Sequence, residues 1–181
     1  AALFGENGDS LHGGDVSILT RGKIRPKFAD PKSHFVHAEV QSPNGALIDV
    51  VSVRLAPPVS RFDFWMPGFW IDHRNKRIEH REQIVELMRH VRSIPESHHL
   101  IVGGDFNAPP ADDSLAELRQ RLSDSFQTSG RGWGATGTND YPLFRADQIW
   151  VSDSLQPASV TAHKTQHSDH RMVVCDLKIH Q

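Results

Sequence analysis

The sequence has little cysteine, no long apolar run and no excess of either charge. Its one cysteine, Cys175, excludes an intrachain disulfide and leaves the compartment undefined. Apolar runs such as residues 46–53 are interrupted by polar side chains and fall far short of the ~20 residues that span a bilayer. We therefore expect no transmembrane segment. Residues 1–6 do not resemble a signal peptide, because no basic region precedes an apolar block.

The charges are nearly balanced, with 20 Lys and Arg against 22 Asp and Glu and a net charge of -2. This balance excludes a global basic field that recruits nucleic acid, so any contact with a polyanion must be local. A hydrophobic content of 38% and a mean hydropathy of -0.45 are typical of a soluble globular protein. The length fits one domain, and we predict a single domain over residues 1–181.

Several segments have the alternation or apolar content of strands. Asn44-Gly45 is a strong hairpin signal between two of them, which predicts an adjacent antiparallel pair. Cys175 lies in the last segment, where we expect a buried strand residue. The predicted strands are residues 15–20, 34–41, 46–55, 99–103, 144–152 and 172–179.

Two segments have helical periodicity. Ile84, Leu87, Met88 and Val91 recur at the spacing of one buried helix face, which predicts a helix over about residues 75–93, ended by Pro95. The basic residues beside that stripe are typical of a solvated helix face. A capping box, Ser114 with Glu117, predicts the start of a second helix that buries Leu115, Leu118 and Leu122. We interpret residues 62–70 as an aromatic loop that either contacts bases or lipid headgroups or packs over the core.

Two familiar patterns fail for lack of context. Gly132 to Gly137 matches G-x-G-x-x-G, but no strand leads into it and no helix follows, so we interpret it as a mobile surface loop. Ser168-Asp169-His170 is not a serine-protease arrangement, because neighbouring side chains point apart. A zinc centre of His163, His167 and His170 stays open as an alternative, although no helix is evident to align the histidines.

Three polar clusters at the ends of apolar segments fit metal-assisted phosphoester hydrolysis. Asp105 and Asn107 follow the strand over residues 99–103, Asp147 opens a later strand, and Asp169-His170 precedes the last one. A hard cation such as Mg²⁺ prefers oxygen ligands, which Asp105, Asn107 and Asp169 supply. His170 can contact a phosphoryl oxygen or move a proton, with Asp147 fixing its tautomer. Together these residues predict a site that binds a cation and a phosphate.

With these clusters in place, the chain resembles the endonuclease/exonuclease/phosphatase superfamily, which includes DNase I and inositol phosphatases. The resemblance spans nearly the whole chain and is carried by residues 18–21, 101–107, 145–152 and 167–170. It implies an α+β fold, a DNase I-like four-layer sandwich of two mixed, mainly antiparallel sheets flanked by helices.

By the resemblance, Asp105 orients or deprotonates the attacking water and Asn107 binds phosphate or metal. Asp147 is the partner of His170, which is catalytic and contacts phosphate, and Asp169 lies near the metal. The implied cofactor is Mg²⁺ or Mn²⁺, held by Asp105, Asn107 and Asp169. The implied reaction is in-line attack of water on phosphorus.

The chain departs from the family pattern in two places. The family begins with one strand that bears an Asn and a second that ends in a Glu, but only about 14 residues precede Asp15, so Glu6 is not assigned. We expect an N-terminally incomplete domain whose exposed sheet edge invites a homodimer. Many relatives also carry a His where this chain has Arg54, which can bind phosphate but cannot deliver a proton at neutral pH.

The leading hypothesis is therefore a divalent-metal-dependent phosphodiesterase, nuclease or phosphatase. The alternatives are a catalytically degenerate module that binds phosphate or nucleic acid, and the histidine zinc hydrolase. The substrate stays open between nucleic acid, a phospholipid headgroup and an inositol phosphate.

Overall fold

The computed structural model describes residues 8–42, 44–57 and 65–179. Its strands are β1 (Asp9–Gly13), β2 (Val16–Thr20), β3 (Lys23–Ala29), β4 (Phe35–Gln41), β5 (Leu47–Arg54), β6 (His99–Asp105), β7 (Ser123–Asp124), β8 (Asp147–Val151), β9 (Leu155–His163) and β10 (Met172–Ile179). The helices are α1 (Pro67–Ser93), α2 (Ala116–Arg121) and α3 (Ser125–Ser129), with a 3₁₀ turn η2 (Asp113–Leu115) before α2. The α+β class predicted from the sequence is confirmed.

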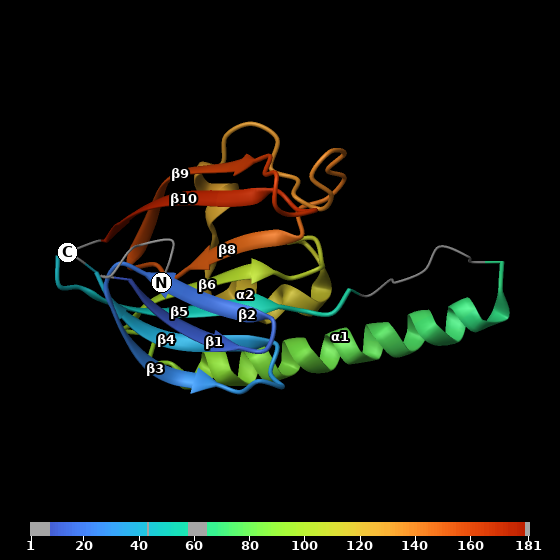
Figure 1. Ribbon diagram of the computed structural model, residues 1–181, viewed down its shortest axis with the longest axis horizontal. Helices are drawn as coiled ribbons and strands as arrows, with labels where there is room; N and C mark the ends of the chain where they lie inside the picture. Colours follow the sequence, from blue (N-terminus) through green and yellow to red (C-terminus); the bar gives the residue numbers. More distant parts are fainter. Residues whose placement is uncertain (1–7, 43, 58–64, 180–181) are drawn as a thin grey trace.

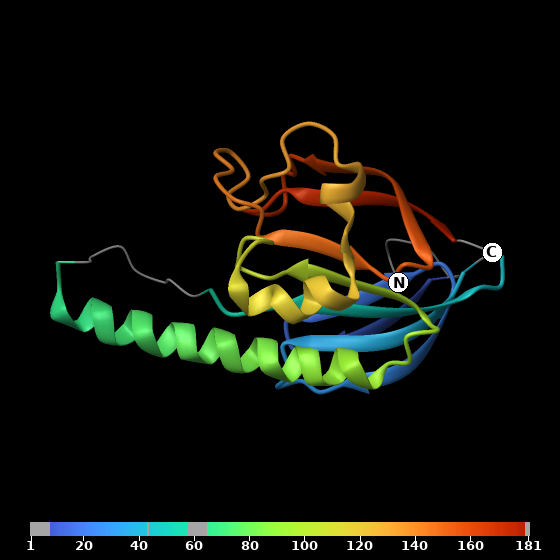
Figure 2. The same ribbon diagram turned by 180° about the vertical axis from the view of Figure 1, so that it is seen from behind.

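A six-stranded mixed sheet forms the centre of the molecule, in the order β3-β4-β5-β6-β8-β7. Its neighbouring strands are antiparallel except for β5 and β6, which are parallel. The helices α1 and α2 cover one face of this sheet, and two ladders, β1-β2 and β9-β10, lie on the other (Figure 1, Figure 2). The second sheet of the predicted sandwich is thus divided into two antiparallel ladders.

Each face of the central sheet has its own core. On the helix side, Leu87 and Val91 of α1 pack with Val51, Val102 and Trp150 of the sheet, all at most 2% exposed. On the other side, Val16 and Ile18 of β2 pack against Val36 and Ala38 of β4. Alternate residues of a strand point to opposite faces, so β4 contributes to both cores. The central sheet is therefore held from both sides.

The two ladders leave a gap between them. A cavity of about 750 Å³ lies there, lined by Ile18 and Leu19 of β2, by Val50 and Ile101 of the central sheet and by Met172 of β10, among others. Among the described residues, β2 pairs with β1 alone and β10 pairs with β9 alone. The edges of β2 and β10 that face this gap therefore have no ladder partner among the described residues.

The long helix extends beyond its predicted start. We expected a helix from about Asn75 and an aromatic loop before it, but α1 begins at Pro67 and includes Phe69 and Trp70. The loop interpretation was wrong for these two residues, because proline is favoured in the first helical turn and does not end a helix there. Residues 58–64 lie outside the described residues. The N-terminal half of α1 projects away from the sheet (Figure 1).

The second helix is capped differently from the prediction. The side chain of Asp112 accepts hydrogen bonds from the backbone N and from Oγ of Ser114, at 2.9 and 2.7 Å, so Asp112 is the capping residue of η2. The predicted cap at Ser114 was wrong by two residues. An aspartate side chain can accept the same hydrogen bond as a serine, and Asp112 takes that role. The predicted burial of Leu115, Leu118 and Leu122 is confirmed.

Two smaller expectations were also wrong. Cys175 lies in β10 as predicted, but it is only half-buried because β10 belongs to a two-stranded ladder. The glycine-rich segment is not simply a surface loop, since Ala135 and Thr136 are buried and Gly134 lies too close to the Phe126 ring to carry a side chain.

No helix within the described residues is long and apolar enough to cross a membrane.

Candidate active site

Strand register places three predicted site residues at one edge of the central sheet. Arg54 at the end of β5 is the partner of Asp105 at the end of the parallel strand β6. Asp105 is also the partner of Asp147 at the start of the antiparallel strand β8. Because paired residues lie about 4.5–5.5 Å apart across a sheet, these three positions are neighbours although 93 residues separate the first from the last.

Asn107 forms two hydrogen bonds to Asp105. Its backbone N donates to Asp105 Oδ1 at 3.0 Å, and its Nδ2 donates to Asp105 Oδ2 at 3.0 Å and to the Leu55 carbonyl at 2.8 Å. Asn107 adopts a positive φ of 48°, a conformation that asparagine tolerates better than most residues. With both donor contacts directed into the protein, the amide oxygen Oδ1 is left for a ligand.

Gly104 makes the close approach of β5 and β6 feasible at this edge. It has a φ of 141°, and a Cβ built on it would lie 2.0 Å from the Val53 carbonyl oxygen. Any side chain would push the two strands apart next to Asp105. A glycine is therefore required where the strand delivers its carboxylate.

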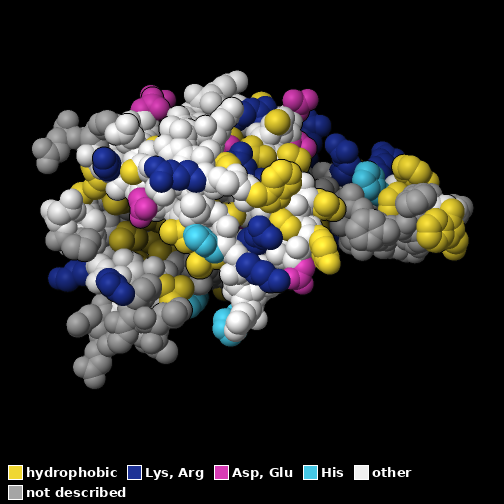
Figure 3. Space-filling view, turned by 90° about the horizontal axis from the view of Figure 1, so that it is seen from above, with side chains coloured by type: hydrophobic (Ala, Val, Ile, Leu, Met, Phe, Trp, Pro, Cys, Tyr) yellow, Lys and Arg dark blue, Asp and Glu magenta, His cyan; other side chains and the backbone are white. Residues whose placement is uncertain are grey.

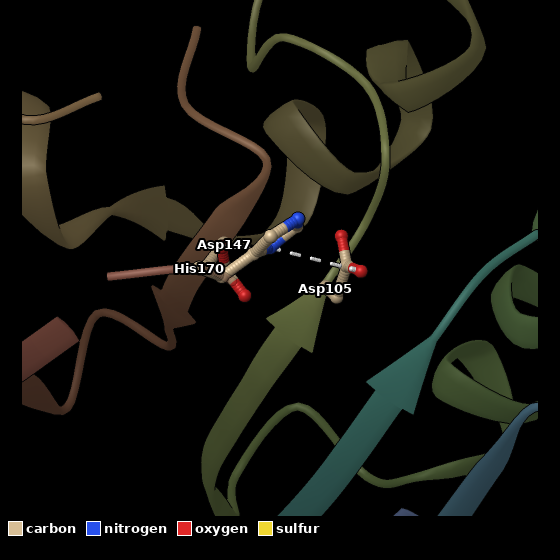
Figure 4. Close-up of side chains that lie close together, drawn as sticks. All are labelled: Asp105, Asp147 and His170. Carbon is tan, nitrogen blue, oxygen red and sulfur yellow. Dashed lines mark hydrogen bonds and ion pairs between the residues drawn. The ribbon is translucent and has the colours of Figure 1, made fainter. Parts of the chain in front are cut away.

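His170 joins the strand residues from the loop before β10. Its Nδ1 lies 2.8 Å from Asp147 Oδ2 and 4.0 Å from Asp105 Oδ2, and Figure 4 shows the three side chains converging. The side chains are only 19–25% exposed. Because Nδ1 contacts Asp147, the second ring nitrogen, Nε2, is the one left for a ligand.

Buried polar contacts hold Asp147 in place. The hydroxyl of Thr136, which is fully buried, accepts hydrogen bonds from the backbone N of Ala146 at 3.1 Å and of Asp147 at 2.9 Å. Arg145 binds the buried carboxylate of Asp124, and Gln148 donates to the Ala108 carbonyl at 2.6 Å. The residues around Asp147 in the predicted motif are therefore structural supports.

The electrostatics of the cluster suit a cation. Burial, followed by repulsion from the Asp147 carboxylate, raises the pKa of Asp105 above its usual value. Hydrogen bonding from Asn107 and the charges of His170 and Arg54 oppose that rise. Donor atoms of Asp105, Asp147 and His170 lie within 4.8 Å of one another. Two carboxylates this close repel unless a positive charge lies between or beside them, so the donor set fits a divalent cation.

A cleft of about 590 Å³ connects the remaining predicted residues. Arg54, Asp105, Asn107, Asp169 and His170 all line it. Arg54 is exposed and lies 3.5 Å from the Asp15 carboxylate. Asp169 is also exposed, and the metal-capable group contains Asp147 in its place. The structure thus brings five of the six predicted residues to the lining of one cleft, and Asp147 joins them through its contact with His170.

Sequence reasoning missed three residues of the candidate site. Lys32 and His34, from the loop before β4, line the far side of the cleft. Neither residue stands in a motif, and only the strand pairing of β4 with β5 brings them near Arg54. Thr136 was hidden in a segment that we interpreted as a surface loop. A buried threonine within a glycine-rich segment was the available signal.

The three histidines of the zinc alternative do not converge. His163 lies on β9 with Nε2 2.7 Å from the Thr161 hydroxyl, and His167 is exposed. Among the described residues, the one group suited to a metal contains His170 but neither of the other two. The geometry therefore gives the zinc alternative no support.

Comparison with protein families gave one match, to the model described as Endonuclease/Exonuclease/phosphatase family, over residues 3–170. This range includes Arg54, Asp105, Asn107, Asp147 and His170. The comparison with curated proteins gave no match.

Solved structures share the fold at low sequence identity. An endonuclease/exonuclease/phosphatase from Bacteroides vulgatus is 14% identical, with a TM-score of 0.64 over 96% of this chain and 77% of that one. A humanized D. rerio TDP2 is 16% identical, with a TM-score of 0.66 over 95% and 77%. A mannosyl-6-phosphatase from Bacteroides thetaiotaomicron is 14% identical, with a TM-score of 0.60 over 96% and 78%.

Proposed function

The chain belongs to the Endonuclease/Exonuclease/phosphatase family, and on that premise we propose that it is a divalent-metal-dependent phosphoester hydrolase. The observation that carries the proposal is the register of β5, β6 and β8, which aligns Arg54, Asp105 and Asp147 beside His170. We also propose that residues 1–181 form a single domain, which contains all the residues of the site.

Asp105 is the proposed base for the attacking water. Its two hydrogen bonds from Asn107 fix the carboxylate, and burial raises its pKa. A carboxylate with a raised pKa is a stronger base than an exposed one. Asp105 can therefore orient a water molecule and accept its proton as the oxygen attacks phosphorus.

His170 and Arg54 are the proposed phosphate contacts. Asp147 accepts from Nδ1 of His170 at 2.8 Å, which fixes the orientation of the ring and leaves Nε2 for the phosphate. When the ring carries both protons, Nε2 donates to a phosphoryl oxygen. Arg54 offers a guanidinium fork to the same group, and Oδ1 of Asn107 faces the cation or the phosphate.

The proposed cation is Mg²⁺ or Mn²⁺. Asp105 and Asn107 would hold it through oxygen atoms, with Asp169 or Asp147 beside them, as suits a hard ion. When bound, the cation would neutralise the charge that builds up on the phosphoryl oxygens. Arg54 cannot protonate the leaving group, because a guanidinium does not give up its proton at neutral pH. We therefore expect esters with acidic leaving groups to react fastest.

A phosphodiester assay tests this proposal. Turnover of bis(p-nitrophenyl) phosphate should require added Mg²⁺ or Mn²⁺ and should disappear in Asp105→Ala and His170→Ala. Lys178→Ala, on β10 and away from the cleft, is the matched control and should keep full activity. Turnover that ignores both the metal and the two site substitutions would exclude the proposal.

Arg54 favours a second candidate function, a module that binds phosphate without turnover. A cleft with an arginine at that position keeps affinity for phosphate but lacks a proton donor there. Calorimetry that shows phosphate binding by a protein with no turnover of activated diesters would favour this candidate. Turnover of those diesters would exclude it.

We also propose that the free edges of β2 and β10 pair with a second copy of the chain. The cavity between the two ladders is lined by apolar residues of both edges, and unpaired strand edges are templates for pairing. Light scattering at micromolar concentration should then give the mass of a dimer. A monomer at that concentration would refute this pairing.

A further inference from the structure

The projecting part of α1 is segregated by charge. In a helix with 3.6 residues per turn, Trp70, Arg74, Arg77 and Arg81 recur at spacings of three and four residues and so share one face. The acidic residues of the same stretch, Asp72, Glu79 and Glu82, fall on the other side. One face of the projection therefore carries three guanidinium groups and an aromatic ring.

This cationic face borders a groove that leads to the candidate active site. The groove has a volume of about 740 Å³ and runs between α1 and the loop after β6, with Trp70 and Arg74 on the helix side. Asn107 lines both this groove and the catalytic cleft. A substrate bound in the cleft can therefore continue along the helix.

Within the part of the chain that the structure describes, Arg74, Arg77 and Arg81 form no ion pair. Lys76 pairs with Glu79 and Arg92 pairs with Glu117 on the same helix. The opposite wall contributes two carboxylates, Asp112 and Asp113. Hydrogen bonds from Ser114, followed by weaker contributions from the charges of His80 and Arg77, lower the pKa of Asp112. The Asp112 carboxylate is thus occupied by hydrogen bonds from Ser114, as the cap of η2.

An aromatic group closes the far end of the groove. The rings of Trp70 and Phe69 meet edge to face with centroids 5.2 Å apart, and His73 stacks on Phe69 at 5.6 Å. Trp70 is nevertheless 60% exposed. Basic and hydrophobic side chains gather on the projection in Figure 3. An exposed indole that neighbours hold in place is a platform on which a base can stack.

The size of the groove selects a polymer over a single phosphate group. From Arg81 to Trp70 the helix rises by roughly 16 Å at ~1.5 Å per residue. That length takes up to about five nucleotides at the ~3.4 Å spacing of stacked bases. A lipid surface would also attract the cations, but it would not reach into a groove that ends at Asn107.

We propose that this groove, with Arg74, Arg77 and Arg81 along it and Trp70 at its end, binds a single-stranded nucleic acid whose scissile phosphate lies in the catalytic cleft. The proposal rests on the proposed function, because it extends the substrate of the same site. The arginines contact successive phosphates, and Trp70 stacks on a base.

Binding measured without turnover tests the groove. The probe is a fluorescein-labelled single-stranded oligothymidylate of about twelve nucleotides, titrated by anisotropy in EDTA at low salt. The triple variant Arg74→Gln, Arg77→Gln, Arg81→Gln should bind about tenfold or more weakly than the parent protein. The salt dependence of its binding should flatten by about two units of slope, since each lost phosphate contact removes ~0.7. Trp70→Ala should weaken binding several-fold without changing that slope.

A matched triple variant controls for net charge. Lys76→Gln, Arg89→Gln, Arg92→Gln removes the same charge from the same helix outside the groove and should bind as the parent does. Equal losses in the two triple variants would overturn the proposal. So would retention of oligonucleotide binding in the groove variant combined with loss of its binding to phosphatidylserine vesicles, which would identify a lipid surface instead. Circular dichroism verifies that each variant is folded.

The failure of this proposal differs from the failure of the proposed function. Oligonucleotide binding that depends on the groove, in a protein that does not hydrolyse bis(p-nitrophenyl) phosphate, would refute the catalytic proposal and support the groove. Turnover of that small diester, together with oligonucleotide binding that does not depend on the groove, would support the catalytic proposal and refute the groove.

Discussion

The two ends of the parallel pair β5 and β6 carry the same kinds of side chain in opposite circumstances. At one end, Asp105, Asp147 and His170 form a half-buried cluster that opens into a cleft. At the other end, His37 Nε2 and His98 Nδ1 contact the two oxygens of Asp49 at 2.7 and 2.6 Å. His90 extends this second cluster, with its Nε2 3.0 Å from His37 Nδ1.

The two clusters differ in how many of their carboxylate oxygens already have a histidine partner. Each carboxylate oxygen of Asp49 has its own histidine, and Asp49 is only 4% exposed, so nothing remains for a ligand. In the first cluster, two carboxylates share one histidine and face solvent. Aspartate and histidine in contact therefore do not mark a functional site by themselves. A shortage of partners beside an open cleft does.

Removing the base of the open cluster should have the largest effect on activity. We expect Asp105→Asn to lower kcat on an activated diester by about 10³-fold, within the range of general acid–base catalysis. Its free energy of unfolding should stay within about 1 kcal/mol of the parent, because the substitution removes a carboxylate that repels Asp147. Steady-state kinetics and urea denaturation measure the two effects. An Asp105→Asn variant with the kcat of the parent protein would contradict the functional role of the open cluster.

Removing the carboxylate of the buried cluster should show the reverse pattern. Asp49→Ala leaves two histidines without their acceptor and opens a buried space, so we expect a loss of about 3–5 kcal/mol in the free energy of unfolding. The kcat of the folded fraction should not change. Asp15→Ala, at an exposed carboxylate, is the control and should cost less than ~1 kcal/mol. Loss of kcat in a folded Asp49→Ala protein would contradict the structural role.

The buried cluster should also set the acid sensitivity of the fold. Burial, followed by the charge of His37, lowers the pKa of His90 to about 4, and burial lowers the pKa of His37 despite Asp49. Lys27 and Glu39 also act on His37, in opposite directions. The unfolded chain therefore binds protons first, and stability should fall as the pH drops from about 6.5 toward about 4.

Replacing His90 isolates its share of this effect. His90→Phe keeps an aromatic ring against Phe28 and Phe35, whose centroids lie 5.3 and 4.9 Å away, but it cannot titrate. Urea denaturation at pH 7 and pH 5 should show a smaller loss for this variant than for the parent protein. An equal loss would exclude His90 as a source of the acid sensitivity.

Arg54 should give the smallest effect and sharpen the contrast between binding and stability. Arg54→Gln removes one phosphate contact, so we expect KM to rise about three- to tenfold with a smaller change in kcat. Its ion pair with Asp15 is exposed on both sides and should contribute less than ~1 kcal/mol to folding. A drop in melting temperature larger than that of Asp15→Ala would contradict the assignment.

Strands with clear apolar or alternating patterns were predictable, whereas β3 and β9 were not. The hairpin at Asn44-Gly45 and the strands before Asp105 and after His170 follow from local patterns. The strand β3 was missed because Lys23, Pro26 and Lys27 suit an unpaired edge rather than a core. Pro157 concealed β9 in the same way. A proline or a cluster of charged residues therefore hides a strand from this kind of pattern analysis.

The residues of the candidate site stand in sequence motifs, but the residues that support them do not. Asp105, Asn107, Asp147 and His170 stand in short recognisable stretches of sequence. Thr136 reaches the backbone of Asp147, and Lys32 and His34 reach the cleft, only through long-range strand pairing and loop packing. The charge segregation of α1 was visible in the sequence, but its direction became meaningful once the groove to Asn107 was known.

The parallel pairing of β5 with β6 also has a consequence for folding. Arg54 and His99 are joined by a long crossover that contains α1, and both clusters are built across this pair of strands. Closing such a crossover costs chain entropy before any contact rewards it, which slows folding. The open and the buried cluster are therefore expected to form in the same late step. A nascent chain would become competent for its chemistry and resistant to unfolding at the same moment.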